Sequence, residues 1–85
     1  MRDFQLSLHA QKVITERNIN IEWIDRVFSN PDKIEYDKKN DILEHRLKVI
    51  EEYYDRVLRL VCNTNEKPIL IVTAFFDRRM KGKIK

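Results

Sequence analysis

The sequence predicts a small α+β domain in which two N-terminal helices pack on one face of a small antiparallel sheet. Three observations support this fold class. Apolar residues recur at helical spacing only in the first third of the chain, they alternate with period two from residue 33 onward, and residues 69–76 form a continuous apolar run of strand length. The expected order of elements is β-α-α-β-β-β-β.

The two helices are marked by their end signals. Phe4-Gln5-Leu6 is expected to be a short strand, and Ser7 is a favoured cap for a helix that runs to about Arg17. Asn18 can adopt the left-handed conformation that ends a helix. Asn20 is expected to cap a second helix, which stops at Asn30-Pro31 because proline excludes helical backbone from the residue before it. The apolar stripes are Leu6, Ala10, Val13 and Ile14 in the first helix, and Ile21, Ile24, Val27 and Phe28 in the second.

Four strands are expected to follow: a short one at Ile34 and Tyr36, residues 42–50, residues 56–62 and residues 69–76. On the second of these the alternation places Leu43, His45, Leu47 and Val49 on one side and Glu44, Arg46 and Lys48 on the other. On the third, Leu58, Leu60 and Cys62 oppose Val57, Arg59 and Val61. The last strand is apolar on both faces, which is typical of a central strand, so we expect it to pair with the Phe4 strand.

Composition limits the class of protein. The 85 residues are expected to form a single domain, and the lone cysteine, Cys62, can form no internal disulfide and is expected to be a small core residue. No apolar run approaches the ~20 residues of a membrane span, and the start lacks a signal-peptide core. We therefore expect a cytoplasmic protein without membrane contact.

Positive charge is concentrated at the C-terminus. The chain has 17 Lys and Arg against 14 Asp and Glu, and residues 78–85 hold five of the basic residues and no acid, so residues 1–77 carry 12 basic against 14 acidic side chains. A local basic tail attracts polyanions through long-range attraction and counterion release. The alternative is a solvated, frayed terminus. The tail contributes Arg78, Arg79 and Lys81 as candidate RNA-binding residues.

The sheet face that the helices leave bare is the candidate functional surface. It is expected to carry Glu44, Arg46, Lys48, Arg59 and Thr73, with Ile71 and Phe75 among them. Cations beside exposed aromatic side chains suit single-stranded RNA, because bases stack on rings and cations hold phosphates. The alternative is an ordinary polar outer face of a half-buried sheet.

No strong catalytic motif is present: the chain has no Gly-rich phosphate loop, no Cys/His metal spacing and no Ser-His-Asp order. No metal or cofactor is therefore expected. His9 borders the buried stripe of the first helix, and Arg17 at its end either complements the helix dipole or completes an anion site. His45 alternates with leucines and is expected to be a hydrogen-bonded core histidine.

Several of these segments resemble one prokaryotic family. Ser7-Leu8-His9-Ala10 and Arg17-Asn18-Ile19 resemble the opening of the family called domain of unknown function 4258. Residues 57–61 and 68–79 resemble its closing strands. The family often has an arginine where this chain has Val13, and a glycine where it has Asn18. The family is similar in size and element order to small ribonuclease toxins of the RelE, ParE and BrnT type. That similarity implies a partner antitoxin, acidic and encoded adjacently.

Together these features lead to the hypothesis of a toxin-like domain that binds RNA or cleaves it without metal. Arg46 and Arg59 would hold phosphate, and His9 or Glu44 would transfer a proton. The candidate RNA-binding residues are Arg17, Lys48, Thr73, Arg78, Arg79 and Lys81. Two alternatives remain open: a non-enzymatic module that binds an acidic antitoxin-like protein, and an inhibitor of a topoisomerase-like target.

Overall fold

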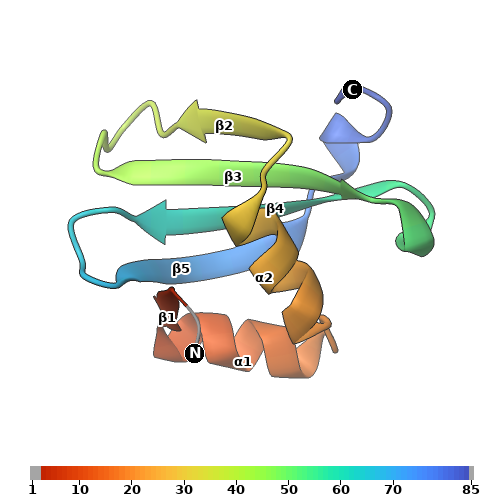
Figure 1. Cartoon of the computed structure of the whole chain (residues 1–85). Helices are drawn as coiled ribbons and strands as arrows, with labels where there is room; N and C mark the ends of the chain where they lie inside the picture. The colour runs from red at the N-terminus through yellow and green to blue at the C-terminus, as the bar shows by residue number, and fades with distance from the viewer. Residues whose placement is uncertain (1–2, 85) are drawn as a thin grey trace.

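The computed structural model describes residues 3–84, which form two helices and a five-stranded sheet (Figure 1). In chain order the elements are β1 (Phe4–Leu6), α1 (Leu8–Glu16), α2 (Ile21–Ser29), β2 (Lys33–Tyr36), β3 (Leu43–Ile50), the short 3-10 helix η1 (Glu51–Tyr53), β4 (Arg56–Asn63), β5 (Ile69–Phe76) and the 3-10 helix η2 (Arg78–Met80). This order confirms the predicted fold class. Within these residues, neither helix is long and apolar enough to cross a membrane.

The helix caps lie where the sequence predicts them. The Ser7 hydroxyl accepts a hydrogen bond from the backbone N–H of Ala10 at 2.9 Å, and the Asn20 side chain accepts one from Glu22 at 2.9 Å. Asn18 has a φ of 55°, the left-handed conformation expected at the end of α1. Ser7 also donates to the carbonyl oxygen of Val72 at 2.7 Å, so the start of α1 is fixed to β5.

The strand order in the sheet is β1-β5-β4-β3-β2. As predicted, β5 is internal and pairs with the N-terminal strand. That pairing is parallel, with Phe4 opposite Ile69, whereas the other strand pairs are antiparallel. The sheet is therefore mixed and not antiparallel throughout as expected, and β1 and β2 form its edges.

Both helices contribute to one apolar core against one face of the sheet. Figure 1 shows α2 in front of the sheet and α1 running along β5. The cluster includes Ala10, Ile24, Val27 and Phe28 from the helices and Ile50, Leu58, Leu60, Cys62, Ile71 and Ala74 from the strands. The thiol of Cys62 is fully buried, and burial raises its pKa to about 12, so the expectation of a small core residue is confirmed.

The register between β3 and β4 corrects the predicted distribution of charges. Residues directly opposite one another project to the same face. Glu44, Arg46 and Lys48 lie opposite Cys62, Leu60 and Leu58, respectively, all three of which belong to the helix-side core. Glu44, Arg46 and Lys48 therefore lie on the helix side, and the prediction that they share the bare face with Arg59 is wrong.

The opposite face, called the open face below, carries the other residues of the same strands. Three of its apolar side chains, Leu47, Val57 and Val61, are buried there outside the main core. Both faces of β4 are thus apolar, so period two alone does not say which face the helices cover.

A shift in the register between β4 and β5 corrects the predicted position of Ile71. The register shifts between Val61 and Cys62, so that Val61 lies opposite Thr73 while Cys62 lies opposite Ile71. Neighbouring residues of β4 project to opposite faces, and so do their partners. Thr73 shares the open face with Arg59, as predicted, but Ile71 is fully buried in the main core and not exposed on that face.

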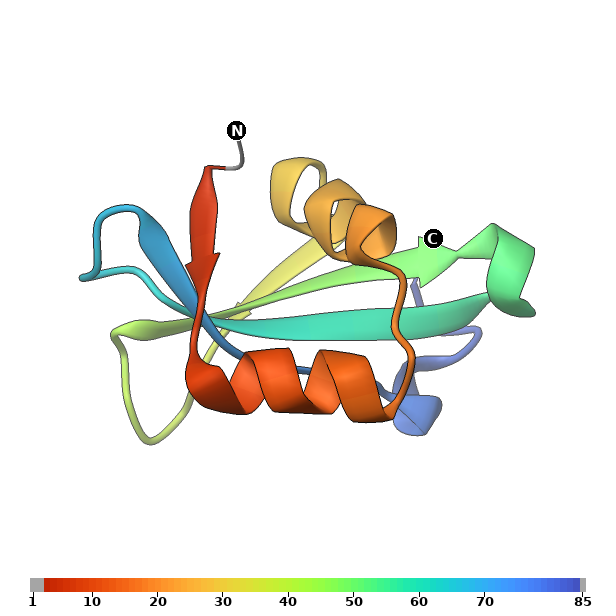
Figure 2. The ribbon, with the colours of Figure 1, turned by 90° about the horizontal axis from the view of Figure 1, so that it is seen from below.

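The segment after β5 covers part of the open face. The backbone N–H of Asp77 donates to the carbonyl of Val57 at 2.8 Å, and η2 contacts β4. Figure 2 shows α2 and η2 on opposite sides of the sheet. Met80 and Ile84 are half-buried, so the basic tail folds back on the domain as far as Ile84. Lys85 lies outside the described residues.

Candidate functional site

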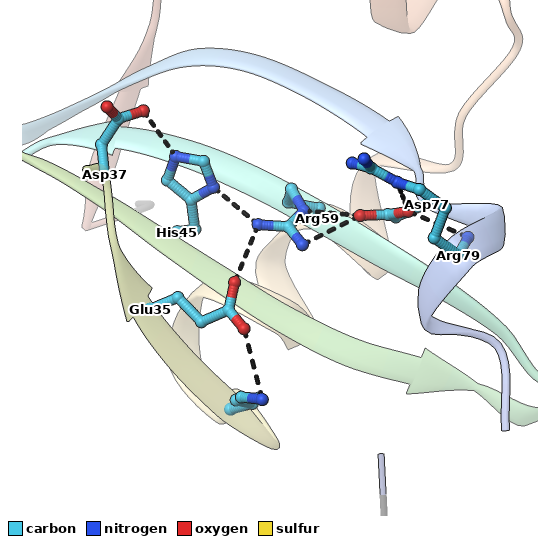
Figure 3. A network of polar contacts seen from close by, with 7 residues as sticks. Glu35, Asp37, His45, Arg59, Asp77 and Arg79 are labelled. Carbon is cyan, nitrogen blue, oxygen red and sulfur yellow. Dashed lines mark hydrogen bonds and ion pairs between the residues drawn. The ribbon is translucent and has the colours of Figure 1, made fainter. Parts of the chain in front are cut away.

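A row of charged side chains crosses the open face, with Arg59 at its centre (Figure 3). Arg59 is 8% exposed and Asp77 is 4% exposed. The guanidinium donates to Asp77 Oδ2 through Nε at 3.0 Å and Nη2 at 2.9 Å. Its Nη1 lies 3.2 Å from Glu35 Oε1 and 2.7 Å from His45 Nδ1. One buried cation thus joins β2, β3, β4 and the segment after β5.

The contacts of His45 assign its tautomer. An arginine nitrogen donates and does not accept, so Nδ1 accepts the hydrogen bond from Arg59. The proton of the neutral ring is therefore on Nε2, which donates to Asp37 Oδ2 at 3.2 Å. Both ring nitrogens are engaged, as expected of a hydrogen-bonded histidine, but the ring lies on the open face and not in the main core.

The carboxylates of this row are held in their ionised form. A hydrogen bond from Lys33, assisted by one from Arg59, holds the pKa of Glu35 below its usual value. Burial alone would raise the pKa of Asp77, but hydrogen bonds from Arg59 and from the backbone N–H of Arg79 outweigh it, and the pKa is lowered. The backbone N–H of Lys39, together with the His45 ring, lowers the pKa of Asp37.

Beside this row the surface is hollowed into a shallow cleft of about 390 Å³, called the charged cleft below. Its walls combine carboxylates, cations and rings. The lining residues are Glu35, Tyr36, Asp37, Lys38, Lys39, His45, Arg59, Phe75 and Arg79. Ionised acid, fixed cations and exposed aromatic faces in one cleft are the groups that bind a phosphodiester and can transfer its protons.

Two predicted site residues, Arg59 and Arg79, meet in this cleft. They differ in accessibility, because Arg59 is buried whereas the Arg79 side chain is 86% exposed and makes only a 3.4 Å contact with Asp77 Oδ1. Thr73 lies on the same face, half-buried. Arg17, Arg78 and Lys81 lie elsewhere, in a second hollow at the end of β5.

The other predicted residues lie away from the cleft. Arg46 is held on the helix side, where it donates to Glu44 at 2.6 Å and to the carbonyl of Phe28 at 2.6 Å and lies over the Phe28 ring. Lys48 pairs with Asp32 at 3.2 Å. His9 is exposed on α1. Glu44 and Arg46 are thus separated from Arg59 by the sheet, which overturns the predicted cluster of two arginines and an acid.

Sequence reasoning missed the acidic half of the cleft, Glu35 and Asp37, and the lysine pair beside it. The sequence did contain a feature from which the position of Glu35 could have been predicted. A short strand was expected at Ile34 and Tyr36, and the turn that follows is short. That strand therefore pairs with the next one, which brings Glu35 opposite His45. Within residues 3–84, no group of three or more His, Cys, Asp or Glu side chains is arranged to hold a metal ion.

Comparison with known proteins gives one match. No curated protein and no solved structure matches the chain. A family model described as "Domain of unknown function (DUF4258)" matches residues 6–76, from the last residue of β1 to the last residue of β5. Both helices and all five strands fall within this range, except for the first two residues of β1. The residues that line the charged cleft also fall within it, except for Arg79. The chain therefore belongs to the DUF4258 family, as its opening and closing segments indicate.

Proposed function

We propose that the chain is a toxin-like RNA-cleaving domain whose chemistry takes place in the charged cleft without a metal ion. The observation that carries the proposal is the combination of Glu35, Arg59 and Arg79 in one accessible hollow flanked by Tyr36 and Phe75. Glu35 is a partly exposed carboxylate, and its oxygens can accept a proton from a hydroxyl placed in the cleft. Arg79 is exposed and available for phosphate.

The cleavage step follows from these positions. Glu35 takes the proton of a ribose 2′-hydroxyl, and that oxygen attacks the adjacent phosphorus. The 5′-oxygen of the next nucleotide leaves and takes a proton from water or from a lysine ammonium at the cleft edge, where Lys38 and Lys39 lie. Arg79 stabilises the charge of the phosphorane, and Arg59 fixes Glu35. The products are a 2′,3′-cyclic phosphate and a 5′-hydroxyl end.

The first prediction tests Glu35. Replacing Glu35→Gln removes the base and keeps the side-chain shape, so cleavage of single-stranded RNA in the presence of EDTA should fall about 10²- to 10⁴-fold. Glu44→Gln is the matched control, since it makes the same charge change on the opposite face and should retain activity within a few-fold. A strand with one 2′-deoxy position should resist cutting there. Equal cleavage by the Glu35 and Glu44 variants would exclude this site.

Toxin function in the cell is a separate part of the proposal. It is supported by the small basic domain and by the similarity in size and element order to RelE- and BrnT-type toxins that the family resemblance implies. Induced synthesis of the chain should arrest growth, and co-expression of an acidic protein from the neighbouring reading frame should relieve the arrest. Arrest that persists in the Glu35→Gln variant would separate toxicity from cleavage.

A non-enzymatic interaction module is the second candidate, and one observation favours it. The edge strand β2 exposes Ile34 at 45% and Tyr36 at 67%, so an extended segment of an acidic partner can add to this edge. A stable complex with the neighbour-encoded protein that forms equally at low and high salt, in a chain that cuts no RNA, would favour the module. Nucleic-acid binding would weaken steeply with salt.

A further inference from the structure

The arginines of the described residues divide into two groups. Four of the seven, at positions 26, 46, 59 and 79, pair with carboxylates. The other three, Arg17, Arg56 and Arg78, make no ion pair with any residue in the range 3–84. These three lie together around one hollow at the end of β5. Short ion pairs engage the arginines at positions 26, 46 and 59, and Arg79 makes only a 3.4 Å contact with Asp77, so the cluster without ion pairs is a local source of positive potential.

This hollow, called the basic groove below, consists of two adjoining pockets. They share Arg56, Phe76 and Arg78 and have volumes of about 240 and 210 Å³. The groove is lined by Arg17, Tyr53, Arg56, Phe76, Asp77, Arg78 and Lys81. Each pocket is smaller than the ~300–1,000 Å³ of typical small-molecule sites, so it suits a phosphate with part of its nucleotide better than a whole cofactor.

The floor of the groove is aromatic and orders one of its cations. The Tyr53 and Phe76 rings lie 4.9 Å apart, and the Arg56 guanidinium lies 4.9 Å above the Tyr53 ring. Stacking on the ring holds the guanidinium plane and leaves its N–H groups available. The carboxylate at the groove wall, Asp77, is buried and already bound by Arg59 and Arg79. An incoming anion therefore meets cations and rings, with the one acid of the wall neutralised.

We infer that the basic groove binds a backbone phosphate of a single-stranded RNA that also passes through the charged cleft. The identity of the anion as RNA rests on the proposed function, whereas the anion site itself does not. The two hollows are joined by η2: Arg78 lines the groove and Arg79 lines the cleft. Arg78 and Arg79 are consecutive residues of η2, so a single strand that crosses η2 can reach both hollows. The rings of the groove favour a nucleotide over an acidic protein segment, because bases stack on them.

The chain contains its own reporter for this site. Trp23 is the only tryptophan, and its ring lies 5.3 Å from Tyr53 and 6.1 Å from Phe76, both of which line the groove. Ligand binding in the groove should therefore change Trp23 fluorescence. The probe is a ten-nucleotide 2′-O-methyl oligouridine, which binds but cannot be cleaved because its 2′-oxygens are blocked. Inorganic phosphate is titrated in a separate arm.

The test compares two double variants that lose the same charge. Arg56→Gln with Arg78→Gln removes two groove cations, whereas Lys12→Gln with Lys67→Gln removes two exposed lysines that line neither hollow. The groove variant should bind the probe about tenfold more weakly. Its slope of log affinity against log salt should be shallower by about 0.7 for each lost phosphate contact. The lysine control should match the parent chain within about twofold.

The outcomes separate this inference from the proposed function. Weaker binding in the groove variant supports the groove even if the parent chain cuts no RNA. Unchanged affinity in that variant would overturn it even if the parent chain does cut RNA. A Trp23 response to inorganic phosphate alone, with unchanged strand affinity, would overturn the assignment to RNA. An acidic peptide that binds the groove while the oligouridine does not would overturn it as well.

Discussion

At the scale of single residues, Arg59 decides how the open face is organised. A guanidinium has five N–H groups in one plane, and here contacts with three side chains use four of them. The cost of burying this cation is offset only while its partners stay in place. Arg59 therefore acts first as the residue that fixes Glu35, His45 and Asp77, and the exposed Arg79 is left to meet the substrate.

The ion pair between Arg59 and Asp77 gives the second prediction. Arg59→Met leaves the Asp77 carboxylate buried without its main partner, so the free energy of unfolding in urea should fall by about 3 kcal/mol. Adding Asp77→Asn to Arg59→Met should recover part of this loss, because the stranded charge is gone. Arg26→Met is the matched control, since it breaks an equally short pair with Glu52 on the surface and should change stability little. Equal losses from both arginine variants would contradict a buried, coupled pair.

At the scale of elements, local signals and long-range pairing differ in how well sequence reveals them. The caps Ser7 and Asn20 and the turn at Asn18 act within a few residues of themselves, so they could be predicted. The face on which Arg46 lies could not, because β4 is apolar on both sides and the register with β3 selects the side. The prediction of the site residues was wrong for the same reason. It placed Glu44 and Arg46 on the face that carries Arg59, and it left out Glu35, which lies opposite His45.

The two helix caps give the third prediction, because one of them also joins elements. Asn20→Ala removes a cap alone and should lower the free energy of unfolding by about 1 kcal/mol. Ser7→Ala removes a cap and also the hydrogen bond to the Val72 carbonyl, so it should cost about 2 kcal/mol. Urea denaturation of the two variants measures the difference. Equal costs would mean that the bond to β5 contributes nothing to stability.

At the scale of the whole molecule, the C-terminal segment has two roles that composition does not separate. Its cations supply the positive net charge of the chain, which was the reason to expect a basic tail that attracts polyanions, with a solvated terminus as the alternative. Its apolar side chains, Met80 and Ile84, are half-buried, and Leu47 and Val57 are fully buried on a face that neither α1 nor α2 covers. The segment therefore serves as a partial second layer: η2 covers part of the open face, and Ile84 lies in a hollow beside Arg26, Lys48 and Glu52. It also places Arg78 at the basic groove and Arg79 at the charged cleft.

The contribution of the charges and that of the apolar side chains can be separated by two variants that change the net charge equally. Truncation after Arg79 removes three lysines together with Met80 and Ile84, whereas Lys81→Gln, Lys83→Gln and Lys85→Gln in the full chain remove the same three charges and keep both apolar residues. Half-burial of two large apolar side chains contributes about 2 kcal/mol, so truncation should lower the free energy of unfolding by about that amount. The triple variant should stay close to the parent chain in stability while losing affinity for RNA, since Lys81 lines the basic groove. A solvated arm would instead leave both variants as stable as the parent, and that result would show that the second layer does not form in solution.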